Sequence, residues 1–374
     1  MISIVELHSK SELKDFVKFP FNLYKGNKYW VPPLISDEID FFDPKINPVF
    51  EHAEARFFVA KKNEQIVGRI AAIRNFTEIE HQGLSKMRFG WFDFVDDYEV
   101  SSRLLEHVYQ LGREHGLNFM EGPVGFSNMD KVGVLTEGFD RLSTMISWYN
   151  YDYYPKHYEA FGMSVEKRYS ESEFLLQNAD PKFFEKSSRL ISQRYELQTK
   201  HYHSTSEVLA VADQMFDLFN ETYASLSSFV PISERQKVYF KKKYLSFINP
   251  EFIKFVFDKH DKMLAFAITM PSFAEALRRA NGKLLPFGIF HLLRAKKNAK
   301  TAILYLIGVH PDYQNKGLTA LLFAALKKEF DAYGIETCHR TPELEDNLAI
   351  QRIWKDFDPV VTQKRVTYKK TLDY

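Results

Sequence analysis

The chain has 374 residues, and its 50 Lys and Arg nearly balance its 49 Asp and Glu, so the net charge is +1. That balance argues against a general nucleic-acid-binding protein, and 16% aromatic residues argue against disorder. At roughly 150 residues per domain, the length predicts two domains. The single cysteine, Cys338, excludes a disulfide framework within the chain, and no apolar run is long enough to span a bilayer, so we expect a cytoplasmic protein.

The first half of the chain predicts a hairpin, a strand and a helix, in that order. Strand-like runs at 56–60 and 65–73 flank a short polar turn. A third strand is expected at 89–95. Apolar residues then recur at helical spacing over 99–114, which predicts an amphipathic helix.

The second half repeats this plan. Its hairpin is expected at 252–257 and 263–270, its third strand at 302–309, and its helix at about 317–330. A plan used twice indicates two domains of one type, which we place at 1–168 and 169–374. The runs of short strands with amphipathic helices predict an α+β fold.

The two copies differ in the connection from the third strand to its helix. Six positions separate Tyr98 from Leu104 in the first copy, whereas eight separate Tyr313 from Leu321 in the second. The first connection has therefore lost two residues, and its glycine with them. The second keeps Gly317.

The second copy also carries an insertion of about 18 residues at about 273–300. Residues 278–300 include seven Lys or Arg and no Asp or Glu, and apolar residues recur among them at helical spacing. A basic amphipathic helix binds an anionic membrane, covers an apolar substrate, or packs on the protein with a solvated polar face. Membrane or lipid contact through 285–300 and a packed lid are both kept as expectations.

The segment 307–319 carries the clearest sign of chemistry. A buried strand ends at Val309, Pro311 stops strand pairing, and the helix begins near Gly317. The free N–H groups and the dipole of a first helical turn attract anions. Gly317 permits close approach of the backbone, and Lys316 adds positive charge. The alternative is an ordinary strand-to-helix turn.

This spacing of Val, Pro, Gln and Gly resembles the acyl-CoA loop of the GNAT N-acyltransferase superfamily. The resemblance implies that the strand end pairs with the pantetheine of coenzyme A and that the loop amides hold its pyrophosphate. It makes acetyl-CoA or another acyl-CoA the co-substrate. The residues so implied are Ile307, Gly308 and Val309 for pantetheine and Gln314, Asn315, Lys316, Gly317, Leu318 and Thr319 for pyrophosphate.

Other segments extend the resemblance. Asn347 matches the Asn of a later family helix and joins the cofactor-binding set. Trp354 stands where many members have a Tyr that protonates the departing thiol, and we interpret it as a packing residue. Thr319 replaces the usual Gly or Ala. The implied fold is two GNAT-like domains, each with a mixed, mostly antiparallel sheet flanked by helices, of which the first lacks a cofactor site. Most of the chain is also similar to an uncharacterised group of two-domain bacterial acetyltransferases.

Direct transfer to an amine requires a base, a polarised thioester carbonyl and a proton for the leaving thiol. Alternation along the strand places Ile303, Tyr305, Ile307 and Val309 on one face. Tyr305 is the polar member of that row, so it is a candidate acid or water ligand, with packing at the cleft floor as the alternative.

The base is sought after the next expected strand, at 335–339. Glu345 is our candidate, and Glu343 is a second carboxylate within reach of the same cleft. The alternative for both is a surface charge or a cap for the helix that follows Asn347. His201 and His203 have no third ligand nearby, so we expect no metal site.

We therefore expect an acyl-CoA-dependent N-acyltransferase that acts by direct transfer on a small-molecule amine of unidentified, lipophilic type. The alternatives are a non-catalytic acyl-CoA or lipid sensor and a transferase that uses aminoacyl-tRNA. We expect no nucleic-acid partner. The location is expected to be the cytoplasm, including the inner face of the membrane, and the oligomeric state is left open.

Overall fold

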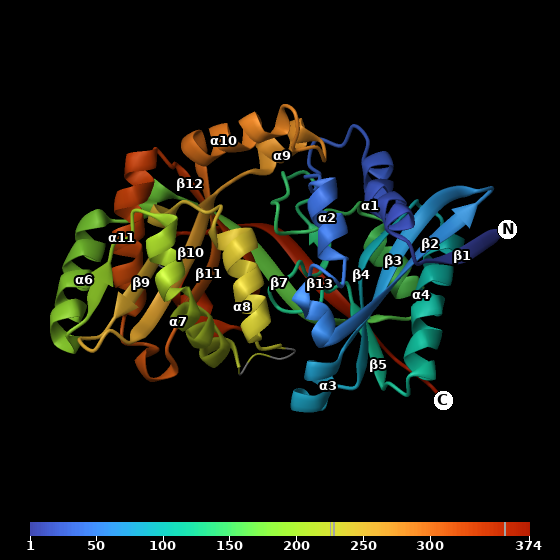
Figure 1. The fold of residues 1–374 in the computed structure, drawn as a ribbon, viewed down its shortest axis with the longest axis horizontal. Coiled ribbons are helices and arrows are strands. Elements are labelled where there is room, and N and C mark those ends of the chain that lie inside the picture. Colours follow the sequence, from blue (N-terminus) through green and yellow to red (C-terminus); the bar gives the residue numbers. More distant parts are fainter. Residues whose placement is uncertain (225, 227–228, 355–356) are drawn as a thin grey trace.

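In the computed structural model, the described residues are 1–224, 226, 229–354 and 357–374. Their strands form one mixed sheet with helices on both faces (Figure 1). The strands are β1 (Ile2–Leu7), β2 (Ala53–Lys62), β3 (Gln65–Asn75), β4 (Lys86–Phe94), β5 (Phe119–Gly122), β6 (Val134–Glu137), β7 (Ser164–Leu175), β8 (Gln198–Lys200), β9 (Ile253–Phe257), β10 (Met263–Pro271), β11 (Thr301–Val309), β12 (Thr337–Leu344) and β13 (Val360–Thr371).

The sheet follows the order β1-β2-β3-β4-β5-β13-β7-β12-β11-β10-β9-β8, and β6 pairs with β13 beside this path. Within the described residues, the parallel neighbours are β4 with β5 and β11 with β12. The prediction of an α+β fold with a mostly antiparallel sheet is confirmed.

The helices fall between the strands as the predicted plan requires. They are α1 (Lys10–Leu23), α2 (Ile35–Phe41), α3 (Phe76–Gln82), α4 (Tyr98–Glu114), α5 (Tyr154–Ala160), α6 (Pro181–Tyr195), α7 (Thr205–Tyr223), α8 (Glu234–Phe240), α9 (Ala274–Ala280), α10 (Gly288–Asn298), α11 (Leu318–Tyr333) and α12 (Leu348–Trp354). None of the helices in the described ranges has the length and apolarity needed to cross a bilayer.

The register of the sheet agrees with the internal repeat. Gly68 in β3 lies opposite Phe94 in β4, and Ala265 in β10 lies opposite Val309 in β11. Phe94 and Val309 each stand three residues before the matching Asp-Tyr dipeptides, Asp97-Tyr98 and Asp312-Tyr313. α4 and α11 then follow their strands, so each half brings the same elements to the same places.

The two halves exchange strands at the centre of the sheet. β13, from the C-terminal part of the chain, pairs with β5 of the first half, and β7 pairs with β12 of the second. β7 and β13 also pair with each other, and Figure 1 shows them side by side between the two halves. Residue 168, where we placed the domain boundary, lies inside β7. These two strands therefore join the halves.

Buried charges connect the three central strands. Glu171 in β7 forms an ion pair with Arg365 in β13, and both side chains are fully buried. His339 in β12 bonds Glu171 through Nε2 and Glu173 through Nδ1, each at 3.1 Å. Burial alone would lower the pKa of His339, but the two carboxylates outweigh it and raise the pKa to about 9. The imidazolium is thus part of the fold.

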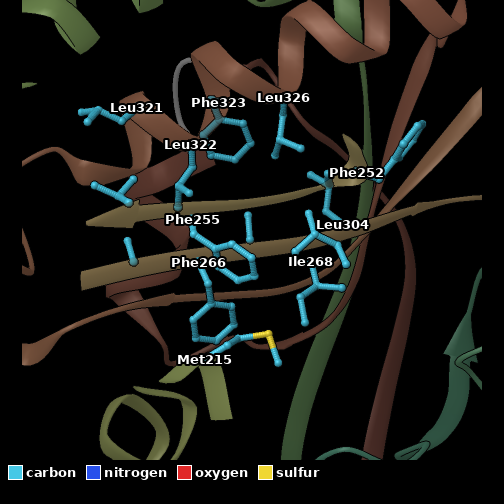
Figure 2. Close-up of a cluster of buried hydrophobic side chains, with 14 of the residues drawn as sticks. Met215, Phe252, Phe255, Phe266, Ile268, Leu304, Leu321, Leu322, Phe323 and Leu326 are labelled. Carbon is cyan, nitrogen blue, oxygen red and sulfur yellow. The ribbon is translucent and has the colours of Figure 1, made fainter. Parts of the chain in front are cut away.

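Each half packs helices on both faces of its part of the sheet. In the first half α4 covers one face, where its Leu104 meets Phe58, and α1 covers the other, where Phe16 meets Phe57. In the second half α11 and α7 take these places. Figure 2 shows Leu322 and Leu326 of α11 on one side of the strands and Met215 of α7 on the opposite side. In the first half, the neighbouring strand residues Phe57 and Phe58 therefore enter separate cores, as period-two patterning requires.

Candidate active site

A cavity of about 570 Å³ lies between the two halves of the molecule. The second half contributes the end of β11, the start of α11 and part of β12. The first half contributes β4, β5 and the loop that follows β5. Side chains that line it include Arg88, Glu121, Asp130, Lys131, Tyr169, Tyr223, Tyr305, Ile307, Val309, Thr319, Glu343 and Trp354.

The loop before α11 presents an open helix N-terminus to this cavity. Gly317 adopts a left-handed conformation with φ of 81°, and it provides no side-chain cap to the helix. Asn315 is also left-handed, with φ of 63°. Ala320 N–H bonds the carbonyl of Gly317, which leaves the earlier amides of this turn directed outward. A left-handed residue that directly precedes a helix in such a turn helps to gather successive backbone N–H groups into a concave anion site.

Most residues of the predicted CoA loop line the cavity. They are Gln314, Asn315, Gly317, Leu318 and Thr319. Lys316 does not line it, and its ammonium lies 4.5 Å from the centre of the Tyr313 ring. The structure therefore gathers the predicted amides at one place and turns the predicted lysine aside.

The end of β11 offers an open backbone edge. Parallel pairing with β12 stops at Leu304 and Arg340, and β11 continues to Val309. His310 N–H bonds β10, so the groups of Val309 and Ile307 point to the opposite edge, because direction alternates along a strand. On that edge Tyr223 donates to the carbonyl of Ile307 at 2.9 Å. This strand end is the segment for which the family resemblance predicts pairing with pantetheine.

Gly308 has a packing role. A Cβ at this position would lie 2.3 Å from the ring of Phe266 in β10. It does not line the cavity, unlike Ile307 and Val309 on either side.

The predicted single face of β11 is wrong, because the strand carries a β-bulge. Ile268 pairs with Leu306 and Thr269 pairs with Leu304, which leaves Tyr305 as the extra residue. The bulge changes the alternation, so Ile303 enters the core while Ile307 lines the cavity. A bulge of this kind has no clear signature in a continuous apolar run.

Tyr305 lines the cavity as expected, and it connects the two halves. Its hydroxyl donates to the carbonyl of Met129 at 3.1 Å. Burial, and then the nearby charge of Asp130, raise the pKa of Tyr305 above its usual value. The phenol therefore stays protonated at neutral pH, so it acts as a hydrogen-bond donor and not as a base.

The structure does not bring Glu345 to the cavity, and this argues against its predicted role as base. Its side chain is exposed, and its amide bonds the carbonyl of Arg168 at 3.0 Å. The reason is that β12 runs on to Leu344, past the predicted end of the strand. Glu343 therefore stays in the strand and lines the cavity.

Glu343 is held by two donors. Arg340 pairs with it, and the indole N–H of Trp354 donates to it at 3.1 Å. Burial raises its pKa while Arg340 opposes that effect. Trp354 is buried and packs edge-on against Phe323, 5.0 Å between ring centres, consistent with our interpretation of a packing residue. Glu343 thus links Arg340 of β12 to Trp354 of α12 at this wall of the cavity.

Asn347 lines the cavity beside these residues. Its side-chain oxygen accepts from the amide of Ile350 at 3.3 Å, so it caps α12. Its amide nitrogen remains a donor group at the cavity wall.

The sequence analysis missed Asp130, which is the strongest candidate for a base. It lines the cavity from the loop after β5, and its Oδ2 accepts from the amide of Ser127 at 2.9 Å. Burial raises its pKa to about 6. A Cβ at Gly125 would lie 2.2 Å from the Cβ of Asp130, so that glycine makes room for it. The run of Gly125, Ser127 and Asp130 was the available signal.

The first-half wall of the cavity is built from paired charges. Lys86 contacts Glu121 at 2.6 Å and Glu78 at 2.9 Å, and Arg88 contacts Glu78 at 2.8 Å. Burial would raise the pKa of Glu121, but Lys86 and Lys167 lower it to about 2. These charges make the part of the cavity wall that comes from the first half polar, while the predicted CoA loop lines the cavity from the second half. In the described part of the chain no group of three His, Cys, Asp or Glu could hold a metal ion.

The insertion lies outside the cavity. None of residues 273–300 lines it, so the interpretation as a lid over the cleft is not supported. Leu277 and Leu292 instead pack with Val31, and the carbonyl of Gly282 accepts from the amide of Ile35 at 3.0 Å. The insertion is docked on the first half.

No family model matches the sequence. Two curated proteins are similar over most of the chain. Protein YghO of Escherichia coli (strain K12) is 27% identical over 351 residues, which cover 92% of this chain and 89% of that protein. A bacterial ceramide synthase of Caulobacter vibrioides is 26% identical over 326 residues, which cover 84% of this chain and 82% of that protein.

Solved structures share the whole fold. A tandem GNAT protein from the clavulanic acid biosynthesis pathway superposes with a TM-score of 0.58 at 12% identity, covering 100% of this chain and 99% of that one. A GCN5-related N-acetyltransferase from Sphaerobacter thermophilus gives 0.52 at 8% identity, covering 100% and 96%. At these identities the likeness concerns the fold.

Proposed function

The chain has the two-domain fold of tandem GNAT proteins, and from it we propose an acyl-CoA-dependent N-acyltransferase. The observation that carries the proposal is a convergence in one cavity. The uncapped N-terminus of α11, the end of β11 that no longer pairs with β12 and the carboxylate of Asp130 all line it. An anion site, a strand edge and a base are the groups that direct transfer from acyl-CoA to an amine requires.

The residues present fit an acyl-CoA co-substrate. The amides at 317–319 would hold the pyrophosphate, and Ile307 and Val309 would pair with pantetheine through their backbone groups. The bound thioester supplies an activated acyl group. Because the amide of Val309 is on the open edge, it can polarise a carbonyl placed there.

We assign the base to Asp130. Its raised pKa of about 6 leaves it ionised at neutral pH, yet close enough to operating pH to accept a proton from the attacking amine. Tyr305 stays protonated and donates a hydrogen bond in the same cavity. These two groups favour an enzyme over the non-catalytic sensor, which remains the outcome if binding occurs without turnover.

We further propose that the acceptor is a lipophilic amine and that the protein works in the cytoplasm. Apolar side chains of Leu304, Leu306 and Ile307 line the cavity between its polar ends. The similar protein from Caulobacter vibrioides is named a bacterial ceramide synthase, which supports an acceptor with a long apolar chain. The buried, unpaired thiol of Cys338 fits a reducing compartment.

A pair of variants at Thr319 tests the cofactor site. T319E places a carboxylate in the first turn of α11, where it favours the helix but repels pyrophosphate. We expect CoA to raise the Tm of the wild type and of the neutral control T319Q, and to leave the Tm of T319E unchanged. Equal shifts in T319E and T319Q, or no shift in the wild type, would contradict the proposed site.

Turnover tests the function separately. Release of free thiol from acyl-CoA of short and long chain should depend on an added amine, and long-chain amino alcohols should be better acceptors than short amines. CoA binding without thiol release over such a panel would instead support the sensor.

A further inference from the structure

The tip of the insertion exposes large apolar side chains. Leu285 and Phe287 are each 72% exposed, Phe290 is 65% exposed and Leu293 is 48% exposed. We call these four residues the apolar tip. Single exposed apolar residues are ordinary on a protein surface, but four within nine positions of the insertion mark an interaction surface.

The apolar tip belongs to an element that is fixed in place. α10 packs its opposite side on the protein through Leu292 and Gly288, which are both buried. A Cβ at Gly288 would lie 2.1 Å from the carbonyl oxygen of Lys283, so the turn before the helix is tight. Figure 1 shows α10 at the outer edge of the molecule, above the sheet. The exposed face therefore remains turned to solvent.

Positive charge surrounds the apolar tip. Phe290, Leu293, Arg294 and Lys297 lie on one helical face by their spacing. Arg294, Lys297, Lys283 and Arg279 are exposed, and the described residues give none of these four an acidic partner. Apolar side chains with long cationic side chains around them match the two layers of an anionic bilayer surface, acyl chains below and phosphate above.

We propose that the apolar tip and its four cations dock the protein on an anionic membrane. Leu285, Phe287 and Phe290 enter the interface, and the Lys and Arg side chains contact lipid phosphates. The docking residues line no part of the cavity, so this proposal does not depend on the proposed catalytic function. A protein partner is the competing occupant, but aliphatic and Phe side chains within a stretch, 278–300, that holds seven Lys or Arg and no Asp or Glu favour lipid.

Flotation with lipid vesicles tests the proposal. We expect the wild-type protein to float with phosphatidylcholine vesicles that contain phosphatidylglycerol, and much less with phosphatidylcholine alone. R294E/K297E should bind the anionic vesicles at least about tenfold more weakly, because each cation near the surface contributes to attraction. F287S/F290S should bind both kinds of vesicle more weakly.

Matched controls use exposed residues on other helices. K14E/K18E makes the same charge change on α1, and F183S/L190S removes two exposed apolar side chains from α6. Both controls should float as the wild type does, and all four variants should keep the wild-type Tm. The proposal fails if the wild type does not bind anionic vesicles, or if the docking variants bind as well as the controls. A concentration-dependent dimer that F287S/F290S abolishes would assign the tip to a second copy instead.

Discussion

The two strand-to-helix connections of this molecule differ at the N-terminus of the helix that follows each of them. In the first half Asp97 caps α4, where its carboxylate accepts from the amide of Glu99 at 3.0 Å and pairs with Lys62 at 3.0 Å. In the second half Gly317 stands at the corresponding position, with no side chain to offer.

The difference shows how a binding site can arise at a helix N-terminus that lacks a side-chain cap. Every helix N-terminus has unpaired amides, and an anion stabilises them. The first half satisfies its amides internally, whereas the second leaves them for a ligand. The first half then serves the cavity in another way, through the loop that carries Asp130. In the proposed mechanism the halves divide cofactor binding from proton transfer, and that division can be tested.

Removing the proposed base should have the largest effect. D130N should lower kcat by roughly 10²–10⁴-fold with the CoA-induced Tm shift unchanged. In the wild type, kcat/KM should rise with pH through about 6, because the base works in its ionised form. The variant should lose that rise. D140N, an exposed change in the same half, is the control, and wild-type kcat in D130N would remove Asp130 from the mechanism.

Breaking the junction between the halves should cost stability. E171Q leaves Arg365 buried without its carboxylate, which should lower the free energy of unfolding by about 3–5 kcal/mol in urea titration. E173Q changes a partly exposed carboxylate that pairs with His339 and, among the described residues, with no other cation, so its loss of stability should be smaller. Equal losses in the two variants would show that the Glu171–Arg365 pair does not hold the junction.

The junction should also respond to pH. The folded-state pKa of His339 is raised to about 9 from an ordinary value of 6.5, so the native state binds the extra proton. The stability that this proton contributes is complete below about pH 6.5 and is lost as the pH rises through about 9. The free energy of unfolding should therefore fall over this range, and H339Q should show a flatter profile between the same limits.

Removing the N-cap side chain of α4 should have the smallest effect of these changes. D97A removes the cap of α4 and should cost about 1 kcal/mol of stability in the same titration. The CoA-induced Tm shift should remain that of the wild type, since the proposed cofactor site lies at the second connection. A reduced shift would mean that the first half takes part in cofactor binding.

Local patterns in the sequence were sufficient to predict the repeated strands and helices and the loop before α11. Both hairpins, α4 and α11 lie within a few residues of their predicted bounds, because hydrophobic period and turn residues act over short distances. The free amides at the N-terminus of α11 could be predicted from Gly317 for the same reason. The resemblance to tandem GNAT proteins is confirmed at the level of fold.

Features set by distant contacts were not predictable. The bulge at Tyr305 changes which residues face the cavity, and nothing in the apolar run of β11 marks it. The extension of β12 to Leu344 keeps Glu343 at the cavity and leaves Glu345, which was expected to reach it as well, exposed. Asp130 lies in a loop without periodicity, so its approach to the second half depends on the packed halves.

The exchange of central strands has a consequence for synthesis of the chain. The edge of β5 in the first half stays open until β13 at Val360–Thr371 has left the ribosome. β7 likewise waits for β12 and β13, its two neighbours in the finished sheet. The N-terminal half therefore cannot mature ahead of the rest, as successive domains commonly do during translation. A gene cut between the halves should yield two fragments that fold only when mixed.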